Sequence, residues 1–199
     1  MPTIDDSGAV KSVRKSALEL LAGLYMFPQK DASLAASLKP RFPGLVQKDV
    51  KDCLSYLGKK GYLSVHRTGR RPATFQITPL GIDIVDGALN DQGIIPTRPD
   101  PAALMAKKAV RSGVVAYCRQ YPESFNGDDE IHIDLLDQGM ERLLLDDVRY
   151  HIWYLAGKEY LEMKTHPASN GVIYLARITA RGMDLADGVL SDAGVTNDE

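Results

Sequence analysis

The sequence of 199 residues contains only two cysteines and one tryptophan, and it has no long uninterrupted apolar run. Cys53 and Cys118 each lie within an apolar helical pattern, which favours buried reduced thiols over a disulfide framework. No apolar stretch approaches the roughly 18 residues that a membrane span needs, and the first ten residues are acidic and polar, unlike a signal peptide. We therefore expect a cytoplasmic protein that does not contact a membrane.

Local motifs of the common catalytic classes are also missing. The sequence has no GxxxxGK[ST], GxGxxG, GxSxG or HExxH pattern, which are the signatures of nucleotide binding, acyl transfer and zinc proteases. The four histidines are scattered, without a second ligand at metal-binding spacing. The acidic stretch FNGDDEIHIDLLDQG departs from the calcium-loop pattern and is interpreted as an inserted acidic loop that leads into a helix. We predict no enzyme, no metal and no cofactor.

Charge is divided unevenly along the chain, although the net charge is only −2. Residues 1–98 contain 14 Lys and Arg against 9 Asp and Glu, a net +5, whereas residues 99–199 contain 10 against 17, a net −7. Because charge of opposite sign attracts different molecules, the two halves are expected to bind different partners.

The sequence does contain an internal repeat. The phrase ITPLGIDIVDGALNDQG (77–93) returns as ITARGMDLADGVLSDAG (178–194) with nine identities in 17 positions, where ordinary residue usage gives about one. Upstream, LVQKDVKDCLSYLGKKGYL (45–63) aligns with LLLDDVRYHIWYLAGKEYL (143–161). The preserved order favours duplication of one supersecondary unit. It predicts a first domain over 10–94, a proline-rich linker over 95–102 and a second domain over 103–195.

Each copy predicts the same elements, and together they predict an α+β fold, mostly α with small β-hairpins. In the first copy, apolar periodicity indicates a helix over 13–25, a short helix capped by Asp31, and a third helix that ends at Gly61. The stretch YLSVHRTGRRPATFQIT predicts a hairpin, and Thr78 is expected to cap the closing helix. The repeated phrase is thus interpreted as structural: a strand end, a helix cap and a closing helix.

Three helices, a hairpin and a helix in this order resemble the winged helix-turn-helix superfamily. The passages LGKKGYL, from the third helix into the hairpin, and ITPLG, from the hairpin into the last helix, are similar to those of regulators of the MarR and PadR groups. The resemblance covers most of both halves and implies two winged helix-turn-helix domains in tandem. It also implies that the third helix of a domain enters the major groove and that the hairpin contacts a neighbouring groove or phosphates.

In the first copy, the third helix and the hairpin tip are polar and basic outside the apolar stripe. The residues that we assign to DNA binding are Gln47, Lys48, Lys51, Ser55, Arg67, Arg70 and Arg71. The lysines and arginines are expected to bind phosphates, and the two uncharged side chains are expected to face base edges. A charged hairpin tip is also common in a turn that is merely solvated, and this alternative stays open.

The second copy presents a different outer face at the aligned positions. Asp146 and Asp147 would repel a phosphate backbone. Leu145, Tyr150 and Trp153 favour a protein interface, because aromatic residues are enriched in interface cores. The alternative for Trp153 is packing within the second copy or against the linker.

These observations predict a sequence-specific transcriptional regulator that binds double-stranded DNA. A homodimer is expected, since two-fold pairing doubles the phosphate contacts and reads a palindromic site. The alternative is a tandem winged-helix adaptor subunit of a larger protein assembly, without sequence-specific recognition of DNA. Lys48 and Lys51 distinguish the two functions: they face a DNA groove in the first and only add solubility in the second.

Overall fold

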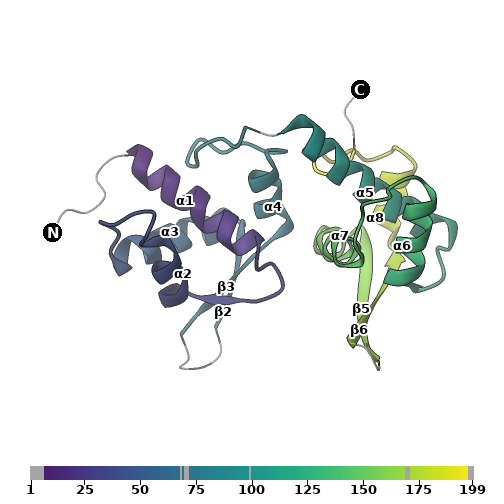
Figure 1. Ribbon diagram of the computed structural model, residues 1–199, viewed down its shortest axis with the longest axis horizontal. Coiled ribbons are helices and arrows are strands. Elements are labelled where there is room, and N and C mark those ends of the chain that lie inside the picture. The colour runs from purple at the N-terminus through teal and green to yellow at the C-terminus, as the bar shows by residue number, and fades with distance from the viewer. Residues whose placement is uncertain (1–6, 68, 70–71, 99, 169–170, 197–199) are drawn as a thin grey trace. The chain divides into compact units, whose positions relative to one another are not determined.

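A computed structural model of the chain describes residues 7–67, 69, 72–98, 100–168 and 171–196. The described chain has eight helices and two small three-stranded antiparallel sheets, which confirms the predicted α+β class (Figure 1). It divides into two compact units, Met1–Pro99 and Asp100–Glu199, which we call unit 1 and unit 2. Both units have the same order of elements: helix, short strand, two helices, hairpin and helix.

Unit 1 places its three strands among four helices. Its elements are α1 (Ser7–Ala22), β1 (Gln29–Lys30), α2 (Asp31–Leu38), α3 (Gln47–Lys59), β2 (Leu63–His66), β3 (Thr74–Ile77) and α4 (Pro79–Asp86). The hairpin pairs Leu63 with Ile77 and His66 with Thr74, and β1 pairs with the other edge of β3. The order in the sheet is therefore β1-β3-β2.

Unit 2 repeats this plan with a longer hairpin. Its elements are α5 (Pro101–Gln120), β4 (Asn126–Gly127), α6 (Asp128–Asp137), α7 (Leu145–Gly157), β5 (Leu161–Ala168), β6 (Gly171–Ile178) and α8 (Ala180–Ala186). Pairing runs from Leu161 opposite Ile178 to Ala168 opposite Gly171, so each hairpin strand has eight residues where unit 1 has four. The far half of β5, from Lys164 to Ala168, is exposed, and Figure 1 shows the hairpin extending away from the helices of unit 2.

The core of unit 1 is built from the apolar faces of its helices. The apolar stripe predicted for the third helix is confirmed at Val50, Cys53, Leu54 and Leu57, which are all 5% exposed or less, whereas its first member, Val46, is the half-buried N-cap of α3. Burial of each such side chain contributes about 1.5–3 kcal/mol. The same burial raises the pKa of Cys53 to about 12, so its thiol is protonated and unreactive at neutral pH. Cys118 is likewise a buried free thiol, as predicted.

Several predicted boundaries differ from the structure. The first helix begins at Ser7 and ends at Ala22, rather than spanning 13–25. Asp31 is the first residue of α2, and the N-cap is Lys30. The acidic stretch is not an inserted loop but strand β4 and helix α6. The predicted linker over 95–102 overlaps α5, because the side chain of Asp100 accepts a hydrogen bond from Ala102 N and caps a helix that begins with proline.

The start of the repeated phrase makes the same contacts in both units. Thr78 Oγ1 donates to Gly61 O at 2.7 Å and accepts from Gly81 N at 3.2 Å, which confirms the predicted cap of α4. Thr179 Oγ1 donates to the carbonyl of Glu159 at 2.7 Å and accepts from Gly182 N at 3.0 Å. The phrase therefore joins the end of the third helix to the last helix of each unit.

The end of the phrase supplies a carboxylate that gathers donors from earlier elements. In unit 1, Asp91 accepts from Lys60 Nζ at 2.8 Å, Tyr62 OH at 2.8 Å and Gly93 N at 2.7 Å. These three partners and Asp91 form the Asp91 cluster. Burial raises the pKa of Asp91, but the hydrogen bonds from Lys60 and Tyr62 lower this pKa by a larger amount. The net pKa of Asp91 therefore lies well below the ordinary value.

Unit 2 contains the equivalent Asp192 cluster. Asp192 accepts from Lys158 Nζ at 2.7 Å, Tyr160 OH at 2.8 Å and Gly194 N at 2.8 Å. The lysine and aspartate side chains are only 14% and 13% exposed. The structural interpretation of the repeated phrase agrees with these contacts, because each copy makes the same hydrogen bonds to the segment between the third helix and the hairpin of its own unit.

Candidate nucleic-acid interface

A concave surface of about 790 Å³ lies between α3 and the hairpin of unit 1. We call it the helix–hairpin groove. The side chains that line it include Lys51, Ser55, Lys59, Val65, Arg67 and Phe75. Three of them are cationic and exposed to solvent. The groove therefore offers positive charge from both the helix and the hairpin.

The helix presents these residues because of its periodicity. With 3.6 residues per turn, burial of the stripe that contains Val50 and Leu57 leaves Lys51, Ser55 and Lys59 on the outer face. The side chain of Lys51 is 62% exposed and lies 3.8 Å from Asp31 Oδ2, a weak surface pair that leaves the ammonium largely available.

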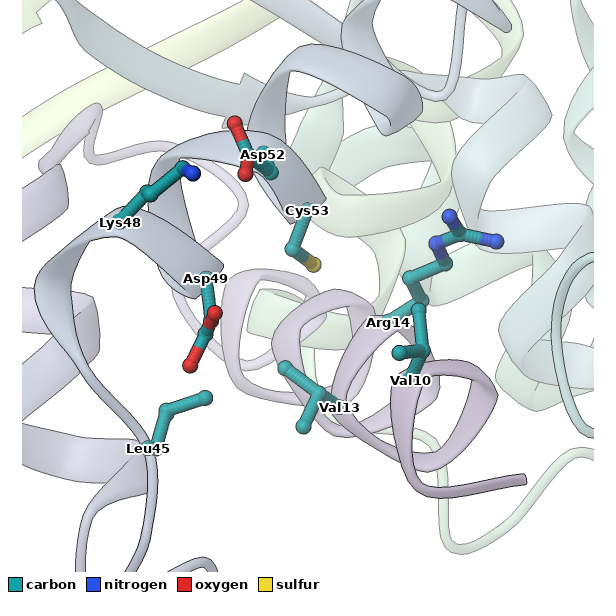
Figure 2. A pocket seen from close by; sticks show the side chains of 8 residues that line it. All are labelled: Val10, Val13, Arg14, Leu45, Lys48, Asp49, Asp52 and Cys53. Carbon is teal, nitrogen blue, oxygen red and sulfur yellow. The ribbon is translucent and has the colours of Figure 1, made fainter. Parts of the chain in front are cut away.

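The structure brings together part of the predicted DNA-binding set. Lys51, Ser55 and Arg67 line the groove. Gln47 lies beside it, since its amide donates to Asp31 Oδ2 at 3.2 Å and this aspartate lines the groove. Lys48, one helical turn before Lys51, does not line the groove but borders a separate pocket between α3 and α1 (Figure 2).

Two predicted residues, Arg70 and Arg71, lie outside the described residues. The predicted DNA-binding set did not include Lys59 or Asp31. The sequence pattern already places Lys59 off the apolar stripe of the third helix, with Lys51 and Ser55. Asp31 carries no such signal, because it reaches α3 from another helix.

In unit 2, the cation at the position aligned with Lys51 is neutralised by neighbouring carboxylates. Arg149 replaces Lys51 in the alignment, and its Nε donates to Asp128 Oδ2 at 2.5 Å. Its other nitrogens donate to Asp146 Oδ1 and Val172 O, each at 3.1 Å. The hydrogen bond with Asp128 raises the pKa of Arg149, although burial opposes this. Because Asp128 is only 1% exposed, this cation is fixed within unit 2 instead of being presented to solvent.

The predicted protein-interface residues lie on α7. Leu145, Tyr150 and Trp153 are each half-buried, and the two aromatic rings stack with centroids 6.2 Å apart. Two strongly exposed apolar residues lie nearby in the fold: Leu144 immediately before α7 and Ile133 on the adjoining α6, at 66% and 59% exposure. The solvent-accessible face of α7 therefore combines these half-buried apolar and aromatic side chains with the exposed carboxylates of Asp146 and Asp147, whereas that of α3 carries exposed lysines.

No helix within the described ranges is long and apolar enough to cross a membrane. The same residues hold no group of three or more His, Cys, Asp or Glu side chains arranged to bind a metal ion.

Comparison with known proteins found similarity to this chain among solved structures. No protein-family model matches it, and no curated protein matches it. Among solved structures, it is similar to a chain described as "Nse1-Nse3-Nse4 complex", with 13% sequence identity and a TM-score of 0.31. The similarity covers 86% of this chain and 83% of that chain.

Proposed function

We propose that this chain is a sequence-specific DNA-binding transcriptional regulator, built from two winged helix-turn-helix units of which unit 1 contacts double-stranded DNA. The observation that carries the proposal is the helix–hairpin groove, where Lys51 and Lys59 of α3 face Arg67 of the hairpin across one concave surface. Neutralising phosphates with such cations supplies most of the nonspecific affinity for DNA.

In this arrangement α3 enters the major groove, which is about 12 Å wide and admits a helix. A helix in that groove has phosphates on both sides. Lys48 lies one helical turn before Lys51 and adds a further cation for phosphate contact. Gln47, at the start of the helix, and Ser55 face base edges. Arg70 and Arg71, which lie outside the described residues, are assigned further phosphate contacts from the sequence.

We assign protein contact to unit 2. The Arg149 side chain is compensated by Asp128 and Asp146, so the surface equivalent to the basic face of α3 has little charge to offer a phosphate backbone. Tyr150 and Trp153 instead provide the kind of aromatic surface that anchors protein interfaces. A homodimer formed through this face places two copies of unit 1 on a palindromic site.

The DNA contact is tested by removing the cations of the groove. Lys51→Ala, Lys59→Ala and Arg67→Ala combined should weaken binding to all duplexes and lower the slope of log K against log salt by about 2 to 3. Affinity is measured by fluorescence anisotropy with a randomised duplex at several salt concentrations. The matched control removes three exposed cations of unit 2, with Arg119→Ala, Lys164→Ala and Arg181→Ala, and should leave the slope unchanged.

Equal slopes for the wild type and the groove variant would exclude DNA contact by unit 1 and favour the adaptor alternative. Sequence recognition has a separate readout, because the wild type should enrich particular duplexes from the randomised pool. Gln47→Ala should change the enriched sequence without changing the salt slope. Failure of the wild type to enrich any sequence would contradict the regulator.

The dimer is tested by light scattering. The wild type should have twice the 21.8 kDa mass of one chain, and the double variant Tyr150→Ala with Trp153→Ala should have the mass of a monomer, because it loses the aromatic anchors. Tyr121→Ala, which truncates an exposed aromatic residue elsewhere in unit 2, should remain a dimer. A monomeric wild type would rule out this assembly.

A further inference from the structure

A separate pocket of about 240 Å³ lies in unit 1 between α1 and α3, away from the helix–hairpin groove (Figure 2). Val10, Val13 and Leu45 line it with apolar surface, and the thiol of Cys53 points into it. Four charged residues complete the lining, namely Arg14, Lys48, Asp49 and Asp52. The pocket is smaller than the roughly 300 Å³ at which sites for drug-sized ligands begin. Its size suits a molecule of few heavy atoms.

The arginine in this pocket has an incomplete set of partners. Arg14 Nη1 donates to Gly93 O at 2.9 Å, and the guanidinium carbon lies 3.6 Å from the centre of the Tyr56 ring. The Nε–H is buried and has no hydrogen-bond acceptor among the described residues. A buried donor without an acceptor is costly, which makes this atom a candidate for contact with a ligand.

Unit 2 shows how the same arginine is satisfied when the chain itself supplies an acceptor. Arg111 donates from Nη1 to Gly194 O at 2.7 Å and lies 3.7 Å from the centre of the Tyr154 ring, which reproduces both contacts of Arg14. Its Nε donates to His151 Nδ1 at 3.3 Å. Burial and the charge of Arg111 lower the pKa of His151, which keeps the imidazole neutral and able to accept.

Position 53 holds the residue that aligns with His151. Cysteine is smaller than histidine, and its sulfur is only a weak acceptor. The substitution therefore leaves both space and an unsatisfied donor at this point in unit 1. At this position unit 2 fills the site with the His151 side chain, whereas unit 1 leaves the space and the Arg14 Nε–H open to a ligand.

The charges around the pocket narrow the class of ligand. Arg14 lies at one end, and Asp49 and Asp52 lie with Lys48 along α3 (Figure 2). The four formal charges sum to zero, so a simple anion would face two carboxylates and a simple cation would face the guanidinium. A ligand that carries both charges matches both ends.

We propose that this pocket binds a small zwitterion with an apolar side chain, of the size and chemistry of a branched-chain α-amino acid. The carboxylate accepts from Arg14 Nε, and the ammonium faces Asp49 and Asp52. The apolar side chain packs against Val10, Val13 and Leu45. This site goes beyond the proposed contact with DNA and does not depend on it.

The test is a calorimetric titration of the full chain with L-leucine, in the absence of DNA. Two analogues each remove one charge: L-leucinamide lacks the carboxylate, and 4-methylpentanoate lacks the ammonium. Each should bind at least about tenfold more weakly than leucine, since each loses a charge-assisted hydrogen bond. Comparable affinity for either analogue would overturn the zwitterion.

Two variants at one position locate the site. Cys53→His reproduces the arrangement of unit 2, so it should keep the fold, fill the pocket and weaken leucine binding at least about tenfold. Cys53→Ala keeps the space and the unpaired Nε–H, and it should bind leucine as the wild type does. Thermal melting of both variants verifies folding. Unchanged binding in the histidine variant, or no binding of leucine by the wild type at about ten millimolar, would overturn the proposal.

Discussion

Asp192→Asn should lower the free energy of unfolding of unit 2 by about 3 kcal/mol, because it leaves the partly buried ammonium of Lys158 without its counter-charge. Asparagine has nearly the same volume and can still accept from Gly194 N. The loss of stability therefore measures the contribution of the carboxylate charge. The single tryptophan of the chain, Trp153, belongs to unit 2. Its fluorescence during urea denaturation reports the unfolding of that unit.

A second aspartate in unit 2 provides the control. Asp187 also pairs with a cation, Arg119, at 3.2 Å, but these side chains are 51% and 43% exposed. Solvent screens an exposed pair, so Asp187→Asn should change stability by no more than about 0.5 kcal/mol. Similar losses in the two variants would mean that burial of the Asp192 cluster does not determine its contribution.

The same cluster predicts a pH dependence. Burial raises the pKa of Asp192, but hydrogen bonds from Lys158 and Tyr160 lower it by more, and the net pKa in the folded state is below the ordinary value. A carboxyl of this kind stabilises the fold above its unfolded pKa and loses that contribution as the pH falls through the folded pKa. Unit 2 should therefore lose stability below about pH 4, and less steeply in Asp192→Asn. Urea midpoints measured between neutral and acidic pH verify this.

Gly81→Ala should destabilise unit 1 by about 3 kcal/mol or more. A Cβ at this position would meet the carbonyl oxygen of Tyr62 well inside van der Waals contact, and Ile77 Cγ1 at 2.8 Å. The carbonyl cannot move away freely, because it accepts from Thr78 N at 3.0 Å. The added methyl group must therefore push α4 away from the hairpin. Urea denaturation followed by far-ultraviolet circular dichroism measures the loss.

Gly44→Ala is the matched substitution, since a Cβ there would meet nothing within 4 Å. It adds the same methyl group to unit 1 and should change stability by no more than about 0.5 kcal/mol. Equal urea midpoints for the two variants would contradict this explanation, namely that glycine is required at position 81 because α4 closely approaches the Tyr62 carbonyl.

Elements that depend on residues close in sequence were predictable. The buried stripe of α3 follows from apolar residues three and four positions apart, and the cap of α4 from Thr78 three residues before Gly81. Strands β1 and β4 were not predicted, because two residues are too few to show an alternating pattern. They form only because an edge of the hairpin offers them partners.

The candidate site was predictable only in part, for the same reason. Periodicity placed Lys51 and Ser55 on one outer face of α3, but it does not tell which neighbour covers each flank. That depends on α1, which packs against α3 and forms with Lys48 and other residues the separate pocket. The difference in charge between the two units was visible in the sequence. The ion pair that neutralises Arg149 was not predictable, because its partner Asp128 lies on a different helix, 21 residues away.

The clusters around Asp91 and Asp192 are each assembled wholly from residues of one half of the chain. A chain of half this length would already contain every donor and acceptor of one such cluster. Because the two clusters share no residue, either unit can exchange its solvent-facing side chains without disturbing the cluster of the other unit. The aromatic residues of α7 and the cationic residues of α3 lie outside these clusters, so the two surfaces can differ while both clusters keep their bonds.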